Sequence, residues 1–178
     1  MIKSKGWDWK IVKDDIDCPW KIPSVESYYL LNRWENLNFK NFLDLGCGLG
    51  RHTVLFAENG FNVSGFDISK EGIRKTKEWL KNLDLKADLK VGDMLELPYE
   101  NESFDCILCR NVISHQDTEG VKQIIKELYR VLKNNGECYL TLGSKSTWGF
   151  KQDSWPLVDE NTRLRMEEGP EYKIPHFY

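Results

Sequence analysis

The chain reads Phe42-Leu43-Asp44-Leu45-Gly46-Cys47-Gly48-Leu49-Gly50 at the point that decides its fold. An apolar run leads into glycines at alternate positions, and the missing Cβ atoms let the backbone turn sharply and come close to a ligand. A helix that follows such a turn points its free N–H groups at that ligand. The stretch therefore predicts a strand over 41–45, a ligand-binding turn, and a helix over 51–59.

The spacing of the glycines narrows the class of ligand. The dinucleotide fingerprint G-x-G-x-x-G requires glycine at position 51, where this chain has Arg51. A phosphate-binding P-loop requires Lys followed by Ser or Thr after its last glycine, and that pair is absent. The chain instead has an acid followed by G-x-G-x-G.

The rest of the sequence alternates strand-like and helix-like segments. This pattern predicts an α/β fold of the Rossmann-like type, an open and mainly parallel sheet with helices on both faces. The expected strands are 41–45, 61–66, 87–91, 104–109 and 138–142, the last after a turn at 134–136. The expected helices are 24–35, 51–59, 70–82 (capped by Ser69) and 119–132.

Three acids stand where the first three strands end. Asp67 can accept both ribose hydroxyls of an adenosine, Asp93 can meet an adenine edge, and Asp44 can meet a cationic amino group. Such a set suits a nucleoside that carries an ammonium group, because two anionic phosphates would be repelled by it.

At these residues the chain resembles the class I S-adenosylmethionine-dependent methyltransferases, and most closely their small-molecule branch with a core of the methyltransferase domain 11/25 type. The resemblance runs from about residue 41 to residue 142, and it implies the strand order 3-2-1-4-5. The motifs that carry it are 44–52, 65–69, 92–94, 104–107 and 132–137.

The resemblance implies that S-adenosylmethionine is the cofactor and S-adenosylhomocysteine its product. The glycine turn would hold the methionine end, Ile68 and Met94 would border the adenine, and Arg110 with Asn111 would lie beside the sulfonium. His52 is open between a cofactor contact and packing at a helix start. The cofactor-binding candidates are Asp44, Gly46, Cys47, Gly48, Gly50, Arg51, His52, Asp67, Ile68, Asp93, Met94, Arg110 and Asn111.

No base–nucleophile pair stands out in the sequence. His115, in the loop after the fourth strand, and His176, near the end of the chain, are weak catalytic candidates. Methyl transfer needs a general base only when the nucleophile is protonated. Cys106 and Cys109 have the C-x-x-C spacing of metal ligands, but residues three apart in a strand point to opposite faces, so we interpret both as core residues and expect no metal site.

Length and composition predict one domain over 1–178, with an N-terminal lid and helix (1–38), a cofactor-binding core (39–143) and a substrate-side tail (144–178). The net charge of −3 provides no strong basic field to recruit nucleic acid, and the family resemblance implies a small-molecule acceptor. There is no membrane-spanning apolar run and no signal peptide, and the five cysteines fit reduced thiols. We therefore expect a cytoplasmic protein.

The two ends of the chain raise further expectations. The family's sixth and seventh strands are expected to be missing, which leaves strand five as an exposed edge. A truncated chain and a homodimer through that edge both stay open. Near the N-terminus, Trp20 is expected to act as a lid over the cofactor, whereas Trp7 and Trp9 are expected to pack on the sheet edge.

The function predicted from these observations is methyl transfer from S-adenosylmethionine to a small molecule by in-line displacement. Two alternatives remain. One is a catalytically silent cofactor-binding or interaction module, and the other is an NAD-dependent oxidoreductase, which the residue at position 51 disfavours.

Overall fold

The computed structural model describes residues 3–13 and 18–178, and its centre is a parallel sheet. The sheet has five strands in the order β3-β2-β1-β4-β5, which confirms the predicted fold class and strand order. Every neighbouring pair in it is parallel. The strands are β1 (Asn41–Leu45), β2 (Asn62–Asp67), β3 (Asp88–Val91), β4 (Phe104–Cys109) and β5 (Leu132–Leu140).

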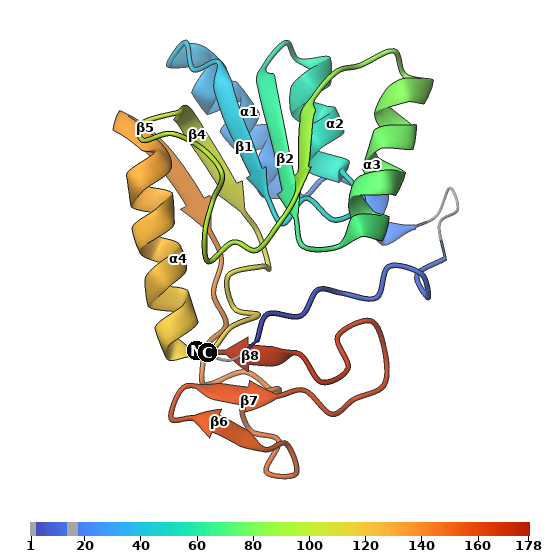
Figure 1. The fold of residues 1–178 in the computed structure, drawn as a ribbon, viewed down its shortest axis with the longest axis vertical. Helices are drawn as coiled ribbons and strands as arrows, with labels where there is room; N and C mark the ends of the chain where they lie inside the picture. Colours follow the sequence, from blue (N-terminus) through green and yellow to red (C-terminus); the bar gives the residue numbers. More distant parts are fainter. Residues whose placement is uncertain (1–2, 14–17) are drawn as a thin grey trace.

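Helices cover both faces of this sheet (Figure 1). Phe42 of β1 points into one apolar cluster with Trp34 and Phe56, whereas its neighbour Leu43 points into another with Ile124. This alternation is the pleat of a strand that is buried on both faces. The helices are α1 (Val25–Asn36), α2 (Arg51–Glu58), α3 (Lys70–Asn82) and α4 (Thr118–Val131), with a short 3-10 turn η1 (Pro19–Lys21) before them.

The two cysteines of the C-x-x-C motif follow the same rule. Cys106 belongs to the cluster around Trp34 and Cys109 to the cluster around Ile124, so their thiols lie on opposite faces of β4. Both side chains are fully buried, and burial raises the pKa of both thiols. The interpretation of this motif as core packing is confirmed.

The tail forms a second sheet that the sequence did not predict. Its strands are β6 (Leu157–Asp159), β7 (Thr162–Leu164) and β8 (Pro175–Phe177), antiparallel in the order β6-β7-β8. Strands of three residues are too short for their alternation to show in a sequence. The small sheet lies beyond the carboxyl ends of the parallel strands, and the N-terminal segment runs between the two sheets (Figure 1).

Strand β5 begins earlier than expected. The predicted turn at 134–136 lies inside this strand, where the register against β4 shifts between Phe104 and Cys106 and Asn135 has a φ of 63°. This register shift accommodates the asparagine–glycine sequence, and the strand continues beyond it. Among the described residues no strand joins the parallel sheet beyond β5, in agreement with the predicted order. A homodimer through this edge stays a prediction.

No helix in the described part of the chain is long and apolar enough to cross a membrane.

An aromatic stack in the core provides a test of this packing. Phe56 is fully buried and stacks on Phe42, with ring centroids 3.9 Å apart. We expect Phe56→Ala to lower the free energy of unfolding by about 3–5 kcal/mol, because it removes apolar contacts and leaves a cavity. Tyr129→Ala on the exposed face of α4 should change it by less than about 0.5 kcal/mol. Urea denaturation of both variants measures the difference, and equal losses would contradict the packing described.

Candidate cofactor site

The turn between β1 and α2 is built on glycines in the left-handed region. Gly46, Gly48 and Gly50 have φ values of 73°, 55° and 89°. A Cβ on each would lie 2.3 Å from Val112, 2.7 Å from Trp9 and 2.5 Å from Thr76, respectively. These three positions therefore require glycine for two reasons: the backbone is left-handed, and there is no room for a Cβ atom.

A pocket opens beside this turn at the carboxyl ends of the parallel strands, where ligands bind in open α/β sheets. It contains about 900 Å³ of unfilled space, counting the part open to solvent. Every predicted cofactor residue except Gly50 lines it, and so does His115. Gly50 instead stands at the N-cap of α2, and His176 lies outside the pocket wall.

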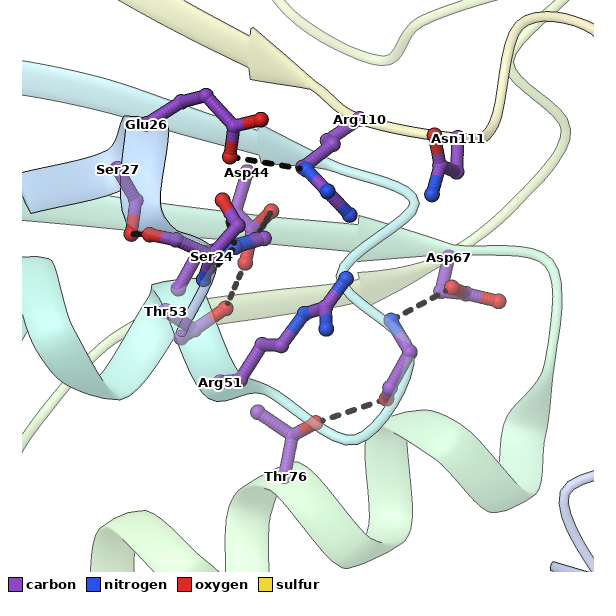
Figure 2. A network of polar contacts seen from close by, with 12 residues as sticks. Ser24, Glu26, Ser27, Asp44, Arg51, Thr53, Asp67, Thr76, Arg110 and Asn111 are labelled. Carbon is purple, nitrogen blue, oxygen red and sulfur yellow. Dashed lines mark hydrogen bonds and ion pairs between the residues drawn. The ribbon is translucent and has the colours of Figure 1, made fainter. Parts of the chain in front are cut away.

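Asp67 braces the turn at the end of β2. One of its carboxylate oxygens accepts a hydrogen bond from the backbone N–H of Gly48 (2.8 Å; Figure 2). The other accepts one from the backbone N–H of Ser69 (2.7 Å). Burial raises the pKa of this carboxyl, and these two hydrogen bonds oppose the rise. Because each carboxylate oxygen has more than one lone pair, Asp67 can still accept hydrogen bonds from a ligand.

Asp44 lies deeper, at the end of β1. It is 2% exposed and accepts a hydrogen bond of 2.6 Å from the hydroxyl of Thr53 (Figure 2). Burial raises its pKa to about 6. Asp44 is thus a carboxylate that loses its charge in mildly acidic solution.

His52 connects the pocket wall to the start of α1. Its Nε2 lies 3.3 Å from the backbone nitrogen of Ser24 and 3.2 Å from the hydroxyl of the same residue. Its Nδ1 is 4.0 Å from Asp44, yet burial lowers the pKa of His52 to about 3 and keeps the imidazole neutral. His52 therefore both packs the helix start and borders the pocket.

Two guanidinium groups point into the same space from opposite sides. Figure 2 shows Arg51, at the start of α2, and Arg110, after β4, directed toward the region beside the turn, with Asn111 next to them. Arg110 has an ion pair of 3.5 Å with Glu26. Burial lowers the pKa of Arg51, and Arg110 adds to this effect by repulsion. Both cations thus line the same pocket as the three acids.

Aromatic residues of the N-terminal segment close the pocket. Trp7, Trp9 and Trp20 pack together, and the ring centroid of Trp7 lies 5.0 Å from that of Trp9 and 4.7 Å from that of Trp20. Trp20 lines the pocket as its predicted lid role requires, but the expectation that Trp7 and Trp9 pack on the sheet edge was wrong, because both line the pocket and Trp9 covers Gly48. Only the density of tryptophan before the first strand could have indicated this.

The segment that carries these tryptophans is anchored to the tail. The backbone nitrogen of Asp8 donates to the carbonyl of Pro170 (3.1 Å), and the Lys5 ammonium donates to the carbonyl of Tyr172 (2.6 Å). Ser4, Lys5 and Gly6 line the pocket as well, and no motif in the sequence marks them.

The two histidines that are candidate catalytic residues, His115 and His176, lie next to each other near the N-terminal segment. Their ring centroids are 5.0 Å apart, and Glu171, which the sequence did not single out, lies between them. His115 also lies 6.0 Å from Trp7 between ring centroids, which places it at the border of pocket and tail. Burial lowers the pKa of His176 to about 4.

A glycine turn after β1, an acid after β2 and a covered pocket at a topological switch point define a nucleoside-binding site of the Rossmann-like class. Residues 42–136, more than half of the chain, match the methyltransferase domain family. The chain belongs to this family, and its fold is that of the class I S-adenosylmethionine-dependent methyltransferases.

The chain is also similar to individual methyltransferases. A demethylmenaquinone methyltransferase of Lactobacillus johnsonii is 30% identical over 129 residues, which are 65% of this chain and 52% of that protein. A norajmaline N-methyltransferase of Rauvolfia serpentina is 38% identical over 96 residues, 52% of this chain and 32% of that protein. The chain thus spans about half the length, or less, of these curated relatives.

Solved structures show the same fold. The crystal structure of a SAM-dependent methyltransferase from Methanosarcina mazei superposes with a TM-score of 0.66 at 27% identity and covers 78% of this chain and 72% of that one. A protein from Pyrococcus horikoshii superposes with a TM-score of 0.56 at 32% identity, over 66% of this chain and 54% of that one.

The glycine turn can be tested with a matched pair of alanine substitutions. Gly46 and Gly60 both have positive φ, but a Cβ on Gly60 would meet nothing within 4 Å. We expect Gly60→Ala to lower the free energy of unfolding by about 1–2 kcal/mol through conformation alone. Gly46→Ala should cost about 1–3 kcal/mol more, because the new methyl group overlaps Val112. Equal losses in chemical denaturation would show that the turn is less tightly packed than described.

Proposed function

We propose that the chain binds S-adenosylmethionine in this pocket and transfers its methyl group to a small-molecule acceptor. The observation that carries the proposal is the convergence of residues that the family resemblance assigns to the cofactor. Asp44, Asp67 and Asp93 come from the ends of three different strands, and all line one pocket with the glycine turn.

The residues present suit this cofactor on chemical grounds. The methionine end carries an ammonium and a carboxylate, which match Asp44 and the guanidinium groups of Arg51 and Arg110. The ribose hydroxyls match the free lone pairs of Asp67, and the adenine matches the apolar surface of Ile68 and Met94. A pocket lined by both acids and arginines fits such a zwitterionic nucleoside.

Once bound, the cofactor supplies an activated methyl group on a sulfonium. The protein then has to align the acceptor and exclude water. In this chain the cover made by Trp7, Trp9 and Trp20 performs the second task.

A small acceptor is supported by two observations. The net charge of −3 provides no basic surface field for a nucleic acid. Two relatives, a demethylmenaquinone methyltransferase and a norajmaline N-methyltransferase, are named for small-molecule acceptors.

The cofactor proposal is tested by calorimetric titration with S-adenosylhomocysteine. We expect micromolar binding, and a loss of about tenfold or more in Asp67→Asn, which keeps the shape of the side chain but removes the charge from the ribose end. Asp153→Asn removes the same charge from a fully exposed side chain and should bind as the unmutated protein does. If the unmutated protein fails to bind, the proposal is wrong and nicotinamide cofactors should be titrated next.

The same titration carried out at several pH values tests Asp44. Its raised pKa of about 6 means that the carboxylate is charged above this value and neutral below it. The ammonium of the cofactor then loses its partner as the pH falls, and the affinity should drop about tenfold from about pH 8 to about pH 5. Asp44→Asn should bind weakly at all of these pH values and lose this slope, whereas the same slope in that variant would assign the effect to another group.

Turnover separates an enzyme from a silent module. The protein should produce S-adenosylhomocysteine when a panel of phenols, quinols, amines and thiols is offered with S-adenosylmethionine. Binding of the cofactor without turnover on any acceptor would favour the interaction module.

A further inference from the structure

A cluster of three potential metal ligands lies where the tail meets the core. His115 comes from the loop after β4, Glu171 from the loop between β7 and β8, and His176 from β8. One ligand atom from each residue lies within 4.8 Å of the other two. The loop after β4 and the distant C-terminal tail thus bring two imidazoles and one carboxylate to a single point.

The backbone holds these side chains together. The nitrogen of Phe177 donates to the carbonyl of Ser114 (2.8 Å), and these two residues are the direct neighbours of the two histidines. The nitrogen of Ile174 donates to the carbonyl of Glu171 (3.0 Å), which fixes the loop that carries the carboxylate. The main chain therefore places the two backbone segments that carry the histidines side by side.

The hydrogen bonding of the cluster is incomplete. The Nε2 atom of His176 is buried and has no hydrogen-bond partner among the described residues, although Glu171 Oε2 lies 3.9 Å away. His115 Nε2 lies 3.7 Å from Glu171 Oε1, again beyond hydrogen-bond distance. Buried nitrogens of this kind are normally satisfied, so the gap between these atoms calls for an occupant.

We propose that His115, Glu171 and His176 form a binding site for a divalent transition-metal ion of the Zn²⁺ class. Two histidines with one glutamate are a known protein ligand set for zinc that leaves further positions open. Bonds of about 2.0–2.2 Å to each ligand would draw the donor atoms to about 3.3 Å from one another, which small side-chain rotations achieve. This departs from the expectation, drawn from the cysteines, that the chain has no metal site.

The surroundings match those of metal ligands. Arg165 forms an ion pair with Glu171, and ligating carboxylates commonly have a hydrogen-bond partner of this kind. Arg165 also pairs with Glu167, and Arg163 pairs with Asp153, so each arginine has an acid of its own besides Glu171. These two arginines and three acids sum to a formal charge of −1 before any ion binds.

The ion would lie where it could act on a methyl acceptor. His115 lines the cofactor pocket, so an open position on the ion would face the border of that pocket. An acceptor hydroxyl or thiol bound there would lose its proton to solvent more readily and become a better nucleophile for the methyl group. This consequence rests on the proposed function, whereas binding of the ion does not.

The experiment measures metal binding alone, without cofactor or acceptor. The full chain is stripped with EDTA, dialysed, and titrated with Zn²⁺ against a chromophoric chelator. We expect one site per chain with a dissociation constant of about 10 µM or lower. His176→Gln and Glu171→Gln should each weaken binding at least tenfold, and circular dichroism confirms that each variant is folded. Cys138→Ala, which removes the least buried thiol, should leave the affinity unchanged.

Substitution with Co²⁺ keeps the test decisive even if a variant fails to fold. The visible spectrum of the unmutated protein should show ligation by nitrogen and oxygen, without a thiolate charge-transfer band. Absence of saturable binding, binding that survives loss of both His176 and Glu171, or a thiolate spectrum would each overturn the metal site. None of these outcomes depends on whether S-adenosylhomocysteine binds, so the proposed function can fail or stand separately.

Discussion

The hydrogen bond from the backbone nitrogen of Gly48 to the carboxylate of Asp67 ties the glycine turn to the neighbouring strand. A turn with three positive φ values is costly to order, because glycine loses more conformational freedom than any other residue. The structure offsets this cost by packing Val112, Trp9 and Thr76 on the three glycines. Each contact comes from a different segment, so the pocket keeps its shape only when the core, α3 and the N-terminal segment are all in place.

The cover of the pocket depends on this turn in the same way. Trp9 rests on Gly48, and Gly6 rests on Ile68 next to Asp67. The segment that carries both residues is bonded to the tail through Asp8 and Pro170. Two parts of the chain separated by more than a hundred residues are therefore bonded to each other beside the site.

Charges of both signs line the pocket. The acids come from strand ends, where burial raises the pKa of Asp44 and Asp67, while Arg51 lies at the start of α2 and Arg110 follows β4. Buried charges are costly without partners. A ligand that carries both an ammonium and a carboxylate would supply those partners, which is why the arrangement favours an amino-acid-bearing nucleoside over a pyrophosphate.

The sequence by itself determined the parallel sheet and the acids and glycines at its carboxyl edge, and the family resemblance supplied the strand order and most of the pocket wall. The sheet and its edge rest on local patterns, such as the apolar run around Asp44, the acids at the ends of the first three strands and the glycines at alternate positions, and such patterns can be read without knowing the fold. The tertiary structure alone decided the place of Trp7 and Trp9, the strands of the tail, and the meeting of His115, Glu171 and His176. Those arrangements come from contacts between segments distant in the chain. A three-residue strand or a single histidine carries no local signal of the partner that it will meet.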